Sequence, residues 1–145
     1  MSASPDAAAI LDQLGKLLRE LTRLAGGADD GPALTATQRI ALIEIADAPP
    51  LRLNDLATRI GTSAPTASRA VDVLDELGLV ARTPDPDDRR AVRIELTAAG
   101  RRLVDERKAR ASAAFEPGVA ALTPADREKL LALLAKLTGA LSPDC

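Results

Sequence analysis

Small and polar side chains gather at the start of one predicted helix, where they are available to hydrogen-bond to a partner. The helix is expected from residue 63 to residue 77, and its outward residues near the start are Ser63, Ala64, Pro65, Thr66, Ser68 and Arg69. Small groups allow a helix to enter the major groove of DNA, where an arginine can reach a guanine edge or a phosphate. No acidic residue lies between Gly61 and Val71, and the helix N-terminus adds partial positive charge. These six residues are therefore candidate DNA contacts.

The same residues also have interpretations that involve no DNA. Ser63, Thr66 and Ser68 belong to the residue types that cap helices and form turns, and capping and contact are equally open for them. Arg69 can pair with Asp72, which lies three residues further along the helix. The far end of the helix holds its acidic residues, Asp72, Asp75 and Glu76. This separation of charge favours contact by the start of the helix.

A second group of charged residues lies in a polar segment between a predicted strand over 79–83 and another over 92–96. Apolar and charged residues alternate along the second of these strands. Arg89 and Arg90, at the tip, can enter the minor groove, whose negative potential favours arginine. Asp88 can hold one of the two in position by a charge-assisted hydrogen bond. An isolated Asp-Asp-Arg-Arg would be an ordinary solvated turn, but the elements on either side favour a DNA contact.

The composition argues against catalytic and metal chemistry. The chain has no His, Trp or Tyr, and it has a single Phe and a single Cys. Without His it lacks the commonest general base, and with Cys145 alone at its end it has almost no ligands for zinc. No pair of acidic residues stands in an apolar context that would raise a pKa. We therefore expect no enzyme activity, no catalytic residue, no metal site and no cofactor, and we expect Cys145 to be a free thiol.

Periodic apolar residues place the candidate contacts within a run of helices. A first helix carries apolar residues at three- and four-residue steps over 10–24. A second opens at Thr35, where Gln38 completes a capping box. A third, short helix over 53–60 is separated by Gly61 from the helix that carries the candidate contacts. The order of helix, helix, glycine turn, helix and hairpin predicts a helix-turn-helix followed by a wing.

Two further helices follow the predicted hairpin. Thr97 caps a long, arginine-rich helix that is expected to end near Phe115. The last helix begins at Thr123-Pro124, with N-cap and N1 residues in their preferred places. Its leucines and those of the first helix form apolar stripes, which need a partner surface. The predicted fold class is mainly α with a small β-hairpin wing.

The predicted wing carries a recognisable signature. Asp88, Arg90, Ala91, Leu96 and Thr97 fit the pattern Asp-x-Arg-Ala-x4-Leu-Thr, and further matching segments are 53–57, 66–69, 78–80, 85–90 and 96–100. With these motifs the chain resembles the MarR family of bacterial winged helix-turn-helix regulators over nearly its whole length. It departs from the family at Val73 and Glu76, where many members carry basic residues, and at Arg52, where a Ser or Thr cap is usual.

The resemblance implies a ligand-responsive repressor that acts as a homodimer on a pseudo-palindromic, double-stranded DNA operator. It implies that the fourth helix is the recognition helix and that the first, fifth and sixth helices form the dimer interface. The single domain, 1–145, would then consist of a DNA-binding winged helix over 35–97 and dimerisation helices over 6–25 and 98–141. Any small-molecule effector is of unknown identity, so no ligand-binding residue is named.

The net charge of −2 does not by itself favour nucleic-acid binding. Only the middle of the chain, 35–110, is not acidic, and its excess of basic residues is a single charge. A winged-helix module that binds protein and never DNA is therefore the alternative prediction. The single cysteine and the lack of a secretory signal or a long apolar run predict a cytoplasmic protein with no membrane partner.

Overall fold

The candidate contacts lie at the start of one helix and in the loop between two strands of a small sheet. The structure, a computed structural model, describes residues 4–25 and 31–141, so Cys145 lies outside the described residues. Its elements are α1 (Pro5–Ala25), α2 (Ala36–Asp47), β1 (Leu51–Arg52), α3 (Leu53–Arg59), α4 (Ala64–Glu76), β2 (Val80–Pro84), β3 (Val92–Leu96), α5 (Ala98–Ala120) and α6 (Pro124–Leu141). Six helices and one small sheet in the described residues confirm the predicted fold class.

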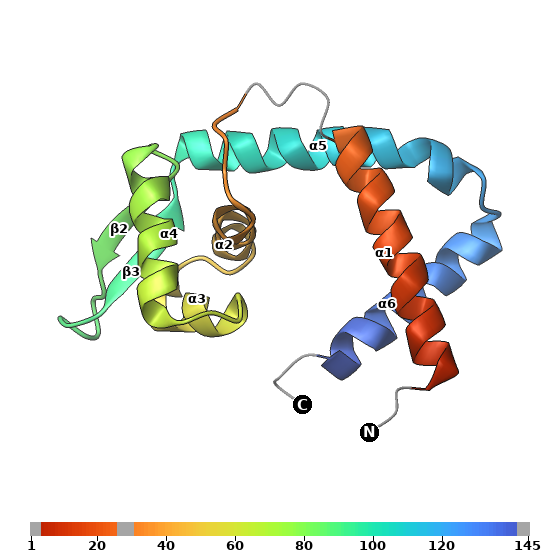
Figure 1. The fold of residues 1–145 in the computed structure, drawn as a ribbon. Helices are drawn as coiled ribbons and strands as arrows, with labels where there is room; N and C mark the ends of the chain where they lie inside the picture. Colours follow the sequence, from red (N-terminus) through yellow and green to blue (C-terminus); the bar gives the residue numbers. More distant parts are fainter. Residues whose placement is uncertain (1–3, 26–30, 142–145) are drawn as a thin grey trace. The chain divides into compact units, whose positions relative to one another are not determined.

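The chain divides into two compact units. The first unit comprises Met1–Gly27 and Arg110–Cys145, and the second comprises Ala28–Ala109. α1 and α6 belong to the first unit, and α2, α3, α4 and the sheet belong to the second (Figure 1). α5 contributes residues to both units. The predicted recognition helix and the predicted wing therefore belong to one compact body.

The sheet has three strands rather than the two of the predicted hairpin. Its order is β1-β3-β2, and both pairings are antiparallel. β2 and β3 form the expected hairpin, in register from Val80 opposite Leu96 to Pro84 opposite Val92. β1 was not predicted, because a strand of two residues is too short to show an alternating pattern. It joins the start of α3 to the hairpin.

The core of the second unit is built from aliphatic side chains that converge from its helices and sheet. The largest fully buried side chains are Leu42, Ile45, Leu56, Leu74, Ile94, Val71 and Val80. They come from α2, α3, α4, β2 and β3, so burial of apolar surface, the main force in folding, ties all these elements together. Figure 1 shows the hairpin lying beside α4, an arrangement that agrees with the contacts between α4 and β2. This core supports the two regions that carry the candidate DNA contacts, the start of α4 and the loop between β2 and β3.

The start of α2 and the ends of α3 and α4 lie where the capping residues and glycines of the sequence predict them. Thr35 and Gln38 form the predicted capping box at the start of α2. Gly61 and Gly78 end α3 and α4 with φ angles of 65° and 69°, a left-handed conformation that L side chains rarely adopt. In each case the next backbone N–H donates back into the last turn, from Thr62 to the Ala57 carbonyl and, after α4, from Leu79 to the Leu74 carbonyl. The glycines thus set the turn of the helix-turn-helix and the entry to the wing.

The predicted end of the fifth helix was wrong. α5 continues through Phe115, Pro117 and Gly118 to Ala120. A proline inside a helix removes one backbone donor, and a glycine costs about 1 kcal/mol relative to alanine, but tertiary context can override such local preferences. The helix is therefore longer than local sequence rules predict.

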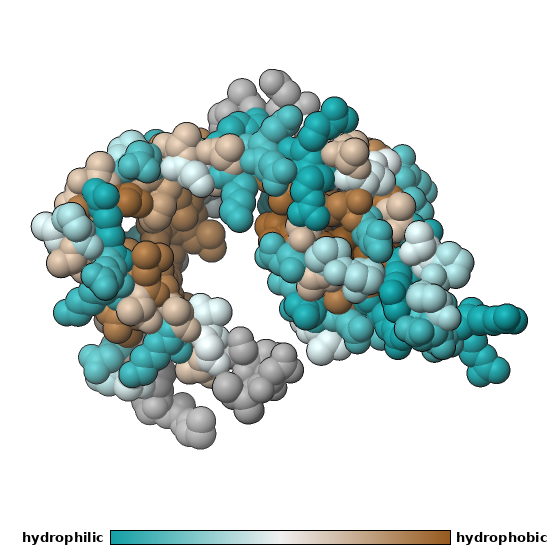
Figure 2. Space-filling view, turned by 180° about the vertical axis from the view of Figure 1, so that it is seen from behind, coloured by the Kyte–Doolittle hydropathy of each residue, from teal (hydrophilic) through white to brown (hydrophobic). Residues whose placement is uncertain are grey.

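The first unit exposes much of its apolar surface. Most leucines of α1 and α6 are exposed, and α6 has no buried residue. Figure 2 shows apolar residues gathered on the surface of this unit, in the left half of the view. No helix within the described residues is both long and apolar enough to cross a membrane.

Candidate nucleic-acid interface

The first turn of α4 combines helix capping with an exposed polar surface. The hydroxyl of Ser63 accepts a hydrogen bond from the backbone N–H of Thr66 (3.4 Å) and lies 2.9 Å from the Thr66 hydroxyl. Arg69 donates to that same hydroxyl from Nη2 (3.4 Å). Ala64 and Pro65 are exposed beside them, in the first two positions of the helix. Ser63 therefore caps the helix, and the surface around it stays open to a partner.

Arg69 does not form the ion pair with Asp72 that was its alternative role. Asp72 instead pairs with Arg82 of β2, whose Nη2 lies 2.6 Å from Asp72 Oδ1 and 3.5 Å from the Ser68 carbonyl oxygen. Sequence reasoning missed Arg82, because it stands ten residues from its partner and on another element. The pair places a positive charge over the acidic residue nearest the start of α4. It therefore lowers the electrostatic cost of bringing α4 towards a phosphate backbone.

The wing tip presents two arginines to solvent. Arg89 and Arg90 are exposed, and neither guanidinium makes a hydrogen bond or an ion pair with any described residue. Asp88 makes the predicted hydrogen bond to one of the two arginines: its carboxylate accepts from the backbone N–H of Arg90 (2.9 Å) and not from its guanidinium. The Asp88 carbonyl also accepts from the N–H of Ala91 (2.9 Å). Asp88 thus shapes the turn and leaves both arginines unpaired.

At the base of the wing loop lies a buried carboxylate that sequence reasoning did not single out. Asp85 is 2% exposed, and it is the only buried charged or polar residue among those the structure describes. Its Oδ2 lies 2.7 Å from Nε of Arg52 and 3.1 Å from Nε of Arg93. Its Oδ1 accepts from Nη2 of Arg93 (3.3 Å) and from the backbone N–H of Asp87 (2.9 Å). Arg52 therefore serves the wing rather than capping α3, where it makes no side-chain cap.

The surroundings of Asp85 stabilise its charged form. Hydrogen bonds from Arg93, from the backbone of Asp87 and from Arg52 hold the pKa of the Asp85 carboxyl well below its usual range, and burial opposes them only in part. In turn, the hydrogen bond and the charge of Asp85 raise the pKa of the Arg52 guanidinium. Both groups therefore carry their charge at neutral pH.

The lowered pKa predicts the direction in which the contribution of Asp85 to the free energy of unfolding changes with pH. A carboxyl whose pKa falls on folding contributes stability above its unfolded pKa, about 4, and loses that contribution as the pH falls towards its folded pKa. The Asp85→Asn variant should therefore have a lower free energy of unfolding than the wild type at neutral pH, with a difference that shrinks below about pH 4. Urea unfolding from pH 7 to pH 2 measures this. Glu128→Gln, at an exposed carboxylate, should show no such loss, and a pH-independent difference for Asp85→Asn would contradict the prediction.

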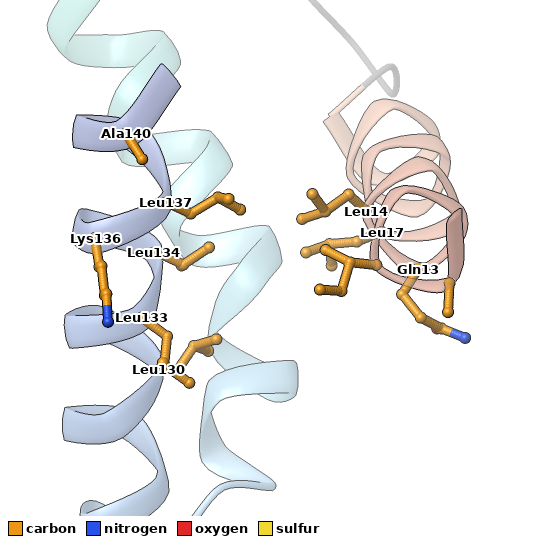
Figure 3. Close-up of a pocket in the computed structure, with 11 residues that line it drawn as sticks. Gln13, Leu14, Leu17, Leu130, Leu133, Leu134, Lys136, Leu137 and Ala140 are labelled. Atoms are coloured by element: carbon orange, nitrogen blue, oxygen red, sulfur yellow. The ribbon is translucent and has the colours of Figure 1, made fainter. Parts of the chain in front are cut away.

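A second surface of interest is an apolar groove within the first unit. It has a volume of about 690 Å³ and lies between α1 and α6, lined mainly by Ile10, Leu14, Leu17, Leu130, Leu133, Leu134 and Leu137. In Figure 3 the leucines of the two helices point towards one another, whereas Gln13 and Lys136 point away from them. A groove so apolar on an exposed surface is typical of a site that packs against another apolar surface.

No group of His, Cys, Asp or Glu in residues 4–25 and 31–141 is arranged to hold a metal ion. The predicted contacts on α4 and on the wing tip instead offer hydroxyl, amide and guanidinium groups, and both belong to the second unit. These groups can donate hydrogen bonds to a polyanion, and the arginines attract it by their positive charge.

Comparison with known proteins agrees with this geometry. The model of the MarR family matches residues 34–91, which include α4 and the wing tip. A probable transcriptional regulator from Pseudomonas aeruginosa is 33% identical, with 88% of this chain and 98% of that chain covered and a TM-score of 0.61. RV1404 from Mycobacterium tuberculosis is 26% identical, with 98% and 97% of the two chains covered and a TM-score of 0.77. The transcriptional repressor CouR, solved bound to a 23-mer DNA duplex, is 25% identical, with 93% and 92% covered and a TM-score of 0.69.

The matched segment, the similar structures and the winged fold agree with one another over most of the sequence. The chain belongs to the MarR family of winged helix-turn-helix transcriptional regulators.

Proposed function

We propose that this protein is a sequence-specific DNA-binding repressor that acts as a homodimer in the cytoplasm, responds to a small-molecule effector, and has no enzyme activity. The observation that carries the proposal is the pair of unpaired, exposed arginines, Arg89 and Arg90, on the same compact unit as the polar start of α4. The similar repressor CouR was solved bound to DNA, which supports the same role here.

In this proposal the two contact regions bind neighbouring grooves. The start of α4 enters the major groove, where Arg69 reaches a base edge or a phosphate. Ser63, Ala64, Pro65, Thr66 and Ser68 allow the close approach, because they are small or compact. The wing places Arg89 and Arg90 in or along the adjacent minor groove. Asp72, the acidic residue nearest the start of α4, is paired with Arg82, and the buried Asp85 at the base of the wing loop is paired with Arg52 and Arg93, so these two carboxylates do not repel the phosphates.

The exposed leucines of the first unit support the proposed homodimer. An exposed apolar groove such as that between α1 and α6 costs free energy in water, and the same helices from a second copy would cover it. Two-fold symmetry then implies two half-sites about 10 bp apart, centre to centre. Occupation of a promoter blocks RNA polymerase, and an effector that changes the spacing of the two recognition helices weakens binding.

Charging the groove should break the dimer. The Leu134→Asp variant places a carboxylate among the groove leucines, where burial against a partner would carry a large desolvation cost. We expect it to be monomeric at concentrations at which the wild type is dimeric, as measured by sedimentation velocity. Lys129→Asp adds a carboxylate to the same helix outside the groove lining and should leave the dimer intact. A dimeric Leu134→Asp variant would place the interface elsewhere.

Binding of the purified protein to fragments from upstream of its own gene, at several salt concentrations, tests the proposed function. Sequence-selective binding at nanomolar concentration, weakening steeply with salt, is the expected result. Absence of binding to every fragment at low salt, from a folded dimer, would favour the alternative of a protein-interaction module. The net charge of −2 is the observation that favours this alternative, because most nucleic-acid-binding proteins carry an excess of positive charge. A reporter assay in a deletion strain tests repression, because target transcription should rise when the gene is removed.

A further inference from the structure

The buried carboxylate of Asp85 connects the wing to the helix-turn-helix. Arg52, which binds Asp85 Oδ2 at 2.7 Å, is the residue directly before α3. Arg93, which binds both carboxylate oxygens, lies on β3. The backbone N–H of Asp87, in the wing loop, donates to Oδ1, and the backbone N–H of Asp85 itself donates to the Ala91 carbonyl across the loop (3.0 Å). One side chain therefore joins the start of α3, the sheet and the wing loop.

The sheet register makes this carboxylate necessary. Arg52 and Arg93 stand directly opposite each other across the β1–β3 pairing. Like charges at opposed positions of an antiparallel pair destabilise it, so these two guanidinium groups would repel without a shared counter-charge. Asp85 supplies that charge from between them. The second negative partner of Arg93, Asp87, lies 3.2 Å from it but is largely exposed, so its pairing is weaker.

Stability alone does not explain a carboxylate at this position. A buried ion pair costs desolvation that its attraction barely repays, and apolar residues in place of Asp85 and both of its arginines would stabilise the site as well. Charge-assisted hydrogen bonds are directional, so they fix the orientation of the groups that they join. The bonds of Asp85 fix the loop immediately before the exposed tip that carries Arg89 and Arg90.

We propose that Asp85 is a positioning residue for the wing, which holds loop 85–91 in one orientation relative to α3 and so presents Arg89 and Arg90 to DNA already ordered. The proposal rests on the proposed DNA binding and adds a residue that touches no DNA itself. A loop ordered before binding does not pay the entropy of ordering at the moment of contact, so affinity increases without any new contact.

Hydrogen exchange in the free protein tests the ordering without DNA. The backbone amides of Asp87 and Ala91 should exchange at least about 10-fold faster in Asp85→Asn than in the wild type, because the bonds that close the loop weaken. Amides of α2 should be unchanged. Asp87→Asn is the matched control, since it neutralises a neighbouring carboxylate but keeps the bonds of Asp85, and it should exchange as the wild type does. Unchanged loop exchange in Asp85→Asn would overturn the proposal.

A double-mutant cycle tests the consequence for binding, with a duplex from the region upstream of the gene as the probe. Asp85→Asn should weaken binding by about 10-fold, and Arg90→Ala should then cost much less in the Asp85→Asn background than in the wild type. Additive effects of the two changes would overturn the positioning role. Should Asp85→Asn fail to fold, Arg52→Gln removes one bond while Asp85 keeps Arg93, and the same coupling is expected. A wild-type protein that binds no DNA would refute the proposed function, whereas the exchange experiment still decides the ordering of the wing.

Discussion

The Arg90→Ala variant is expected to bind its operator at least about 30-fold more weakly than the wild type, with an unchanged fold. Each lost arginine contact to DNA costs about 1–3 kcal/mol, and a homodimer loses one contact at each of its two wings. The Arg90 guanidinium is exposed and bonds to no described residue, so its removal takes no intramolecular contact with it. Fluorescence anisotropy with a labelled operator duplex measures the loss, and the salt dependence of binding should become less steep.

Arg102→Ala is the matched control for this prediction. Arg102 is an exposed arginine on α5, outside both candidate contact regions. Its removal changes the net charge by the same amount, and we expect little change in affinity, because long-range attraction between exposed charges is screened at physiological salt. Equal weakening by the two variants would mean that only the total charge of the protein matters. In that case the wing would make no specific contact.

Local sequence signals were sufficient to predict the helix-turn-helix and the hairpin. The capping box at Thr35 and the left-handed glycines at 61 and 78 depend on residues within a few positions of each other. A short segment of sequence is therefore enough to predict each of them. Helix α4 and the β2–β3 hairpin were predicted from the same kind of local signal. Local consistency of this kind is what makes a sequence specify one fold.

The long-range connections could not be predicted in the same way. Arg52 and Asp85 are 33 residues apart, and their pairing depends on β1, a strand too short to have a pattern. The Asp72–Arg82 pair likewise joins two different elements. Sequence reasoning saw Arg52 only as an unusual residue at a cap position. Its pairing with Asp85 can be recognised only in the three-dimensional structure, because the two residues come together only when the elements that carry them are packed.

Gly100 is another position whose role follows from packing alone, and replacing it with alanine is expected to destabilise the fold severely. A Cβ at Gly100 would lie 1.9 Å from the carbonyl oxygen of Leu79 and 2.9 Å from its carbonyl carbon. These are backbone atoms of a buried residue, so they cannot move aside as the end of a flexible side chain could. We expect Gly100→Ala to lower the free energy of unfolding by at least about 3 kcal/mol, because overpacking forces the backbone to shift.

The bonds around Leu79 explain why the backbone has no room to shift. The Leu79 carbonyl accepts from the N–H of Thr97 (3.0 Å), and the Thr97 hydroxyl donates to the Gly78 carbonyl (2.6 Å). The same hydroxyl accepts from the N–H of Gly100 (3.0 Å), which fixes the first turn of α5 against the end of α4. Moving α5 away to accommodate a methyl group would break this network. The entry to the wing would then lose its support along with the helix.

Gly118→Ala gives a control of opposite sign within the same helix. A Cβ at Gly118 would meet no atom within 4 Å, so alanine should stabilise α5 by about 0.5–1 kcal/mol through its higher helix propensity. Guanidinium unfolding of the variants at one fixed protein concentration measures both effects, since the stability of a dimer depends on concentration. If Gly100→Ala were as stable as Gly118→Ala, α5 would not approach Leu79 so closely. Opposite signs would show that packing against one backbone carbonyl, and not helix propensity, determines the residue at position 100.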